Sequence, residues 1–249
     1  MKFSALAGLA RSLLMYYAIP GRAAAWRGFY RRFFIARDLC FDIGAHVGNR
    51  TAAMLALGAR VVAVEPQPLF ARTLKRLYGS NPNFHLVEKA VSSFRGRREL
   101  MISHQTPTVS SLSKEWVRQV APAPAFANVD WDEQFLVDVV TLDALISEYG
   151  SPAFCKIDAE GSELEILIGL SQPILTISFE YLPPFADRAV ECLDRLSVLG
   201  SYRFNLISGE HPRFVFNDWT DSSELTRFLE ELTLTERPGE IYARLNALV

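Results

Sequence analysis

The chain of 249 residues contains only three cysteines and four histidines. Cys40, Cys155 and Cys192 form no CxxC pair, and none of them stands near a histidine at the spacing of metal ligands. This pattern argues against a zinc site and a disulfide framework, and it favours a reducing compartment such as the cytoplasm. Cys40 and Cys155 lie within apolar runs, which predicts that they are buried as small hydrophobic side chains.

An excess of one charge and long hydrophobic runs are also missing. Lys and Arg number 26 against 28 Asp and Glu, a net charge of -2, so no nucleic-acid partner is expected. Arg11 interrupts the first apolar stretch, and no stretch reaches the roughly 18 apolar residues that cross a bilayer. We therefore expect neither a secretory leader nor a membrane span. A content of 49% hydrophobic and 22% charged residues is ordinary for one globular domain with additions.

The first 40 residues are unusually basic. They contain one acid, Asp38, and seven basic residues: Lys2, Arg11, Arg22, Arg27, Arg31, Arg32 and Arg37. The sequence predicts helices over 3–18 and 23–36, so residues 1–38 form an N-terminal helical extension of a domain spanning 39–249. The preferred interpretation of the charge is a solvated helical face that caps the domain. Peripheral contact with anionic lipid is the alternative, in which case the protein is membrane-associated.

From residue 39 onward, short apolar runs alternate with helical segments. This pattern predicts an α/β fold with a doubly wound, mostly parallel, seven-stranded sheet. The expected strands cover 39–43, 60–64, 84–88, 137–141, 153–157, 174–179, 202–207 and 241–245. The expected helices cover 51–57, 69–78, 142–149, 162–170, 187–199 and 218–236.

The middle of the chain departs from this alternation. Residues 97–103 alternate weakly after a turn and predict a piece of an antiparallel hairpin. Residues 104–134 lack periodicity and contain Pro107, Pro122 and Pro124, so a long loop or lid with one short helix is expected.

The clearest motif lies where the first strand gives way to a helix, in the stretch FDIGAHVGNRT over residues 41–51. Its spacing is D-x-G-x-x-x-G, with Asp42 before Gly44 and Gly48, and not the G-x-G-x-x-G of dinucleotide-binding folds. An acidic strand end suits a nucleoside cofactor without phosphates but with a cationic head. S-adenosylmethionine, with its ammonium and sulfonium groups, fits that description. The alternative is a plain glycine turn.

Acids also end the following strands. Glu65 follows the second strand, where a carboxylate can accept the hydroxyls of a ribose; alternatively it complements a helix dipole. In the stretch KIDAEGSE over residues 156–163, Asp158 and Glu160 follow another buried strand, although Glu160 could simply cap the next helix. Because sites in open α/β sheets lie at the carboxyl ends of the strands, we expect several acids to gather at one edge. They are Asp42, Glu65, Glu88, Asp158 and Glu180.

These blocks together resemble the FkbM-type methyltransferases, within the Rossmann-like class I fold that uses S-adenosylmethionine. The resemblance also rests on EKAVS at 88–92 and VTLD at 140–143, and it spans about residues 39–181. It implies that Asp42, Gly44 and Gly48 shape the methionine end of the cofactor site, that Glu65 holds the ribose, and that Lys89 and Ala90 lie beside the adenine. The full predicted cofactor set is Asp42, Gly44, Ala45, Gly48, Asn49, Thr51, Glu65, Pro66, Lys89, Ala90 and Asp158.

The resemblance further implies that Lys156, Asp158 and Glu160 face the transferred methyl group and the acceptor, as the catalytic set. His46 stands where many members carry Asn, and residues 110–112 resemble a short block that some members carry near the site. The implied activity is O-methylation of a sugar, a glycan or glycolipid, or a secondary metabolite. Our hypothesis for the general base is Asp158.

Two other functions stay open. One is a methyltransferase-like scaffold that binds the cofactor without catalysis. The other is a nucleotide-sugar or NAD-dependent enzyme, which the missing G-x-G-x-x-G disfavours. A divalent metal is not indicated by any ligand spacing, although clustered carboxylates could hold one. The partner we expect is therefore a small-molecule or glycan acceptor.

Overall fold

The computed structural model describes residues 3–123, 126–233 and 235–246. Lys2 and Pro124, both used in the sequence interpretation, lie outside these residues.

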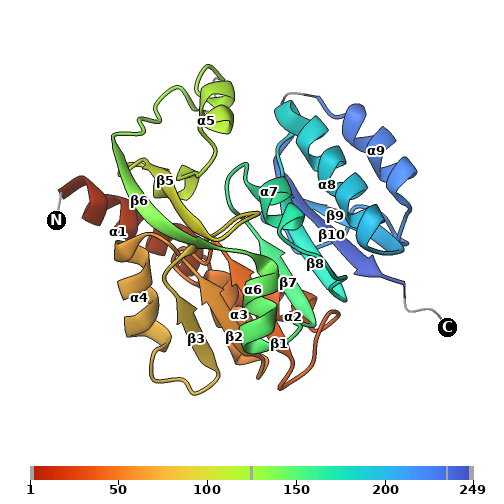
Figure 1. Cartoon of the computed structure of the whole chain (residues 1–249), viewed down its shortest axis with the longest axis horizontal. Coiled ribbons are helices and arrows are strands. Elements are labelled where there is room, and N and C mark those ends of the chain that lie inside the picture. Colours follow the sequence, from red (N-terminus) through yellow and green to blue (C-terminus); the bar gives the residue numbers. More distant parts are fainter. Residues whose placement is uncertain (1–2, 124–125, 234, 247–249) are drawn as a thin grey trace.

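A seven-stranded sheet forms the centre of the molecule (Figure 1). Its strand order is β3-β2-β1-β7-β8-β10-β9, and only β10 runs antiparallel to its neighbours. This arrangement confirms the predicted mostly parallel, seven-stranded sheet. The strands are β1 (Leu39–Ile43), β2 (Arg60–Val64), β3 (Phe84–Val87), β7 (Phe154–Ile157), β8 (Thr176–Tyr181), β9 (Tyr202–Ser208) and β10 (Gly239–Leu245).

Successive strand residues point to opposite sides of the sheet. Both sides carry apolar side chains, and helices cover both faces. Leu39 and Phe41 of β1 join one hydrophobic cluster, whereas Cys40 between them joins another. The first cluster packs under α6 (Leu142–Tyr149), α7 (Glu163–Ile168), α8 (Ala186–Leu199) and α9 (Ser222–Glu230). The opposite face packs under α2 (Arg22–Tyr30), α3 (Asn49–Ala56) and α4 (Pro68–Tyr78). The sheet is therefore doubly wound, as predicted.

Two of the three helices predicted after residue 160 were longer than the helices observed. The predicted helix 218–236 is reduced to α9, whose start is fixed by Asp221: its side chain accepts a hydrogen bond from the backbone N–H of Glu224. The predicted helix 162–170 begins one residue later and ends at Ile168, before Gly169. The Asp221 cap, rather than hydrophobic periodicity, sets the start of α9.

A second, three-stranded sheet lies above the carboxyl ends of the main strands (Figure 1). It contains β4 (Ala90–Val91), β6 (Glu133–Val140) and β5 (Gly96–Ile102) in that order. The expected hairpin piece is β5, which pairs antiparallel with β6. The strand predicted at 137–141 is the end of β6 and belongs to this small sheet. Between β5 and β6 lie the short helices η1 (Pro107–Val109) and α5 (Lys114–Val120). A further short helix, η3 (Pro183–Phe185), precedes α8.

The N-terminal helices differ in how they are attached. In α2, Trp26, Phe29 and Tyr30 are buried against the main sheet. The preceding helix α1 (Phe3–Tyr17) packs on η1 and leaves Leu14 67% exposed. Among the described residues, no helix has the length and apolar character needed to cross a membrane. All three cysteines are buried free thiols, which confirms their predicted burial for Cys40 and Cys155.

Candidate active site

The loop after β1 and the loop after β7 approach each other so closely that only glycine fits at position 44. A Cβ atom on Gly44 would lie 1.8 Å from the carbonyl oxygen of Asp158, and its φ of +77° is one that glycine adopts without strain. The backbone N–H groups of Gly44 and Ala45 both donate to the carbonyl of Val64, at 2.9 and 3.0 Å. The ends of β1, β2 and β7 are thus held together at one edge.

Glu65 ends β2 and is buried at 2% exposure. Its two carboxylate oxygens accept hydrogen bonds from the backbone N–H groups of His46 (2.8 Å) and Gln67 (2.9 Å). Burial raises the pKa of Glu65 from the usual 4.5 to about 7, and the two backbone donors only partly oppose this rise. The carboxylate is therefore held in a fixed position and changes charge near neutral pH.

Two buried groups of opposite charge lack full partners. Thr51 Oγ1 donates to Asp42 Oδ2 at 2.6 Å, whereas Asp42 Oδ1 has no partner among the described residues. Arg50 Nη2 donates to Glu210 at 3.0 Å and its guanidinium lies 3.1 Å from the centre of the Trp26 ring, yet Nη1 is likewise unpaired. Since buried polar atoms normally have partners, such a pair is expected where a ligand supplies them.

Lys156, the third residue of β7, forms an ion pair with Asp158: Nζ lies 2.7 Å from Oδ2. The lysine side chain is only 4% exposed. Burial would lower its pKa, but the carboxylates of Asp158 and Asp42 raise it, so Lys156 stays charged. Burial would raise the pKa of Asp158, but the neighbouring cations, Lys156 first, bring it below its usual value. Asp158 is thus held as a carboxylate.

Close to this ion pair, the carboxyl group of Glu160 has a pKa shifted in the opposite direction to that of Asp158. The backbone of Glu160 has a φ of +48°, which is strained for a residue with a side chain. Burial raises the pKa of Glu160 well above its usual value, and the carboxylates of Glu180 and Asp158 add to the rise. Carboxylate oxygens of Asp158, Glu160 and Glu180 lie within 4.8 Å of one another, so these three could hold a divalent cation. The Lys156 ammonium already places one positive charge beside this group.

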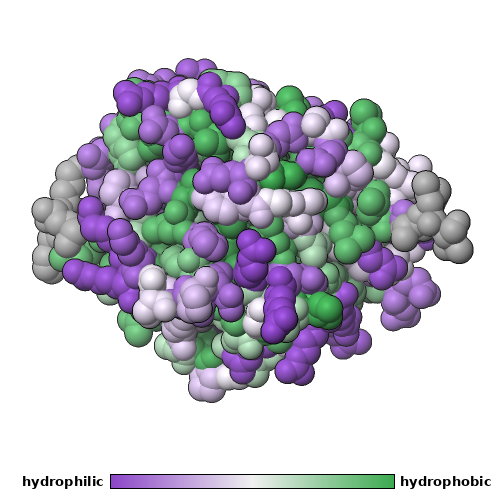
Figure 2. All heavy atoms as spheres, turned by 60° about the horizontal axis from the view of Figure 1, so that its bottom comes forward, coloured by the Kyte–Doolittle hydropathy of each residue, from purple (hydrophilic) through white to green (hydrophobic). Residues whose placement is uncertain are grey.

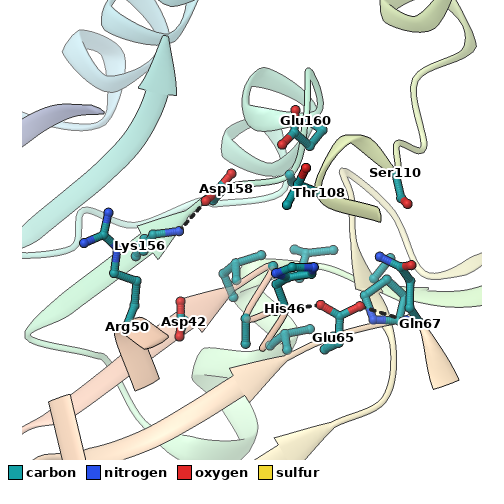
Figure 3. A pocket seen from close by; sticks show the side chains of 18 of the residues that line it. Asp42, His46, Arg50, Glu65, Gln67, Thr108, Ser110, Lys156, Asp158 and Glu160 are labelled. Carbon is teal, nitrogen blue, oxygen red and sulfur yellow. Dashed lines mark hydrogen bonds and ion pairs between the residues drawn. The ribbon is translucent and has the colours of Figure 1, made fainter. Parts of the chain in front are cut away.

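Most of these side chains, but not Thr51 or Glu180, line one cavity, which encloses about 900 Å³ including its part open to solvent (Figure 3). In Figure 3, Asp42, Arg50 and Lys156 lie at one end, Glu65, Gln67 and Ser110 at the other, and Asp158 and Glu160 above. The predicted residues that line this cavity are Asp42, Gly44, Ala45, Asn49, Glu65, Pro66, Lys89, Ala90, Lys156, Asp158 and Glu160.

Residues 42–233 match the profile of the methyltransferase FkbM domain. This match covers most of the 249-residue chain. The protein belongs to the FkbM methyltransferase family. None of the curated proteins is a significant match.

Several solved structures are similar at low sequence identity. Precorrin-6Y C5,15-methyltransferase from Geobacter metallireducens is 12% identical, with 89% of this chain and 87% of that chain covered and a TM-score of 0.45. A TehB-like SAM-dependent methyltransferase from Corynebacterium glutamicum is 10% identical, with 95% and 94% covered and a TM-score of 0.45. Aeropyrum pernix fibrillarin, solved with S-adenosylmethionine bound, is 9% identical, with 84% and 67% covered and a TM-score of 0.43.

Two predicted cofactor residues of this FkbM methyltransferase lie behind the cavity wall. A Cβ atom on Gly48 would lie 2.6 Å from Leu74 Cδ2, so the glycine makes room for α4. Thr51 acts on the cavity through its hydrogen bond to Asp42. Of the five acids expected at one edge, Glu88 is exposed and lines a separate hollow, because its side chain follows β3 at the outer edge of the sheet.

Sequence reasoning missed several lining residues. Arg50 stands inside the glycine motif, but nothing in the sequence distinguishes it from a surface arginine. Glu210 follows β9, and Tyr16 reaches the cavity from α1; neither belongs to a motif. Arg50 and Glu210 are 160 positions apart in the chain. Their contact therefore follows only from the order of the strands in the sheet.

His46 is a neutral imidazole in this site. Burial lowers the pKa of His46 to about 4, and Lys156 contributes to the lowering. The ring centre lies 4.2 Å from that of Phe70, and Nε2 lies 3.5 Å from Ser12 Oγ of α1. His46 therefore links α1 to the loop that carries the glycine motif.

Proposed function

We propose that this FkbM methyltransferase transfers the methyl group of S-adenosylmethionine to a hydroxyl oxygen of a sugar, a glycan or glycolipid, or a secondary metabolite. One observation carries the proposal. A single cavity is lined by Glu65, by Asp42 and Arg50, each of which has one unpaired side-chain atom, and by the Lys156–Asp158 pair.

The amino-acid end of the cofactor suits the two unpaired groups. Asp42 Oδ1 is a buried acceptor, which suits the α-ammonium group of a methionine unit. Arg50 Nη1 is a buried donor, which suits the α-carboxylate. A zwitterion bound here would provide both missing partners, so the residues present fit the cofactor.

The nucleoside end suits the opposite side of the cavity. Glu65 would hold the ribose hydroxyls with its fixed carboxylate, as the family resemblance implies. Lys89, Ala90 and Pro66 would lie beside the adenine, where the buried side chains of Val91, Leu100 and Leu112 add apolar surface.

When bound, S-adenosylmethionine supplies a methyl group on a sulfonium centre, which leaves as a neutral thioether once an acceptor atom has taken the methyl carbon. The protein's own part is to orient the acceptor and to remove its proton. Lys156 and Asp158 form a fixed ion pair at the end of β7, and Glu160 stands beside them with a raised proton affinity. These are the groups that we expect to face the acceptor.

The test is methyl transfer from S-adenosylmethionine to a panel of neutral sugars, glycolipids and polyketide-type alcohols. We expect the product S-adenosylhomocysteine to form only with an acceptor, and NMR of the methylated product to show a methyl ether. Methylation of nitrogen, carbon or RNA instead would overturn the O-methyltransferase assignment. Cofactor binding without transfer to any of these acceptor classes would favour the scaffold function.

The first variant to measure is Asp158→Asn. We expect it to abolish transfer while the dissociation constant for S-adenosylmethionine changes little, because Asp158 faces the acceptor side of the cavity. Turnover equal to that of the unchanged protein would remove Asp158 from the catalytic set.

A further inference from the structure

The helix α1 has a small and polar inner side and an apolar outer side. Gly8, Ser12 and Tyr16 follow one another at intervals of four residues and so share one side of the helix. Gly8 and Ser12 are buried and Tyr16 is half-buried, whereas Leu6 and Leu14 are 43% and 67% exposed. A helix that belongs to a hydrophobic core has the opposite arrangement. Polar and close backbone contacts, more than apolar burial, therefore hold α1 in place.

The inner side of α1 joins two walls of the cofactor cavity. Ser12 Oγ lies 3.5 Å from Nε2 of His46, in the loop with the glycine motif. A Cβ atom on Gly8 would lie 2.4 Å from the carbonyl oxygen of His104 and 3.2 Å from Cδ of Pro107, so the glycine lets α1 approach the segment that enters η1. Both His46 and Pro107 line the cavity. The helix thus lies across the cavity and contacts it on two sides.

Tyr16 extends this contact into the cavity, because its side chain is part of the lining. Its ring stands edge-on to that of His46, with 6.0 Å between the ring centres. Burial first, and then the charges of Asp158 and Glu210, raise the pKa of Tyr16 well above its usual value, so the hydroxyl group stays protonated. Arg50 also acts on it, and Arg50 with Glu210 marks the end of the cavity that suits the methionine unit. The hydroxyl group is a neutral donor that suits the carboxylate of that unit.

Tyr17, the last residue of α1, fastens the helix to the glycine motif. Its hydroxyl oxygen lies 2.9 Å from the carbonyl oxygen of Val47 and 2.6 Å from the hydroxyl oxygen of Tyr78. The hydroxyl oxygen of Tyr78 in turn lies 3.2 Å from the carbonyl oxygen of Gly48. These hydrogen bonds connect α1, the glycine loop and the last residue of α4.

The link between α1 and α2 is free to bend. Residues 18–21 are all exposed, and no atom lies within 4 Å of the position that a Cβ atom on Gly21 would take. The helix α2 that follows is buried against the main sheet through Trp26 and Phe29. A movement about this link can therefore carry α1 away from the cavity and leave α2 in place.

We propose that α1 is a cover of the cofactor site that turns about residues 18–21: it opens to admit S-adenosylmethionine and, once closed, holds the methionine end of the cofactor through Tyr16. The inference rests on the proposed function and adds to it an element outside the matched family profile, which begins at residue 42. Tyr16 is the residue that touches the cofactor. Tyr17 and Tyr78 are positioning residues that keep the cover closed.

Limited proteolysis of the full chain with trypsin tests the closure. Arg11 is exposed on α1, yet trypsin cuts after it only when α1 has left its place and unwound locally. We expect saturating S-adenosylhomocysteine, which carries the same methionine unit, to slow this cut about fivefold or more. The cut after Arg95 is the control, since Arg95 is exposed between β4 and β5 and does not line the cofactor cavity. Its rate should stay unchanged.

Stopped-flow tryptophan fluorescence separates a moving cover from a fixed wall. In Tyr17→Phe we expect the association and dissociation rate constants of S-adenosylhomocysteine both to rise about fivefold, because the closed position loses a hydrogen bond and the site is open more often. In Tyr16→Phe only dissociation should become faster, about fivefold, because a contact with the bound molecule is lost. Tyr149→Phe is the matched control: Tyr149 ends α6, does not line the cavity and should change neither rate constant.

Unchanged rate constants in Tyr17→Phe, or a rise in dissociation alone, would mean that α1 is a fixed wall and would overturn the cover. Unchanged dissociation in Tyr16→Phe would remove Tyr16 from the cofactor site. Binding of S-adenosylhomocysteine without slower cleavage after Arg11 would refute the cover and leave the proposed function standing, whereas absence of binding to the unchanged protein would refute both.

Discussion

At the scale of single residues, buried charge decides what this site can bind. Glu65 changes charge near neutral pH, His46 stays neutral, and Asp42 and Arg50 each keep one unpaired atom. The sequence predicted Asp42 and Glu65 because both are acids at strand ends. It could not predict that Nη1 of Arg50 is unpaired, since this depends on how the side chain packs against Trp26 and Glu210, both distant in the chain.

Cofactor affinity should depend on pH through Glu65. Its ionised form accepts hydrogen bonds from ribose hydroxyls, and its pKa of about 7 means that the protein holds more of this form at pH 8 than at pH 6. We expect the dissociation constant for S-adenosylmethionine to fall on the order of tenfold from pH 6 to pH 8. Titration calorimetry at both values measures it. In Glu65→Gln this dependence should disappear; a variant as pH-dependent as the unchanged protein would assign the titration to another group.

At the scale of elements, the site depends on how closely loops approach one another. Strand and helix positions followed from hydrophobic periodicity, as β1, β2 and β7 illustrate. The three-stranded sheet did not, because β4 has only two residues and the start of β6 alternates between exposed and partly buried positions. No local sequence pattern indicates that β10 lies between β8 and β9 in the sheet.

Gly44→Ala tests the contact between the loops after β1 and β7. The added Cβ would meet the carbonyl oxygen of Asp158 at 1.8 Å, and a backbone atom there cannot move aside cheaply. Gly21→Ala is the matched control, because Gly21 has a similar φ of +79° with nothing within 4 Å. Urea denaturation should show a loss of about 1 to 2 kcal/mol in the free energy of unfolding for the control and about 3 kcal/mol or more for Gly44→Ala. Equal losses would mean that the close approach does not constrain the loops.

Helix α1 belongs to the basic N-terminal segment for which contact with anionic lipid is the alternative interpretation. Its inner side reaches the cavity through Tyr16, whereas Leu14 and Met15 are 67% and 43% exposed beside the exposed Arg11. On another view of the surface, hydrophobic residues lie scattered among hydrophilic ones (Figure 2). If this alternative holds, the protein will float at low salt with phosphatidylglycerol vesicles and not with phosphatidylcholine vesicles, because the first 40 residues are basic.

Leu14→Ser should weaken that flotation, whereas Val198→Ser, at a residue 77% exposed on α8, should not. Absence of binding to the anionic vesicles at low salt would leave the basic charge as a solvated face.

At the scale of the whole molecule, the fold gathers residues from α1, from three strand ends of the main sheet and from the loop after β9 around one cavity. The sequence predicted the sheet and most of the residues that line this cavity near Asp42 and Glu65, because both follow from short local motifs. The position of Glu210 could not be predicted in the same way. Glu210 follows β9, which lies in the sheet only through its pairing with β10, an arrangement of the complete sheet.

The most direct measurement is calorimetric titration of the purified protein with S-adenosylmethionine, beside NAD and beside the variant Glu65→Ala. We predict micromolar binding of S-adenosylmethionine, no binding of NAD, and a loss of affinity of about tenfold or more in the variant, because a hydrogen-bonded charged group is removed. Absence of binding, or binding indifferent to Glu65, would contradict the cofactor site described for this cavity.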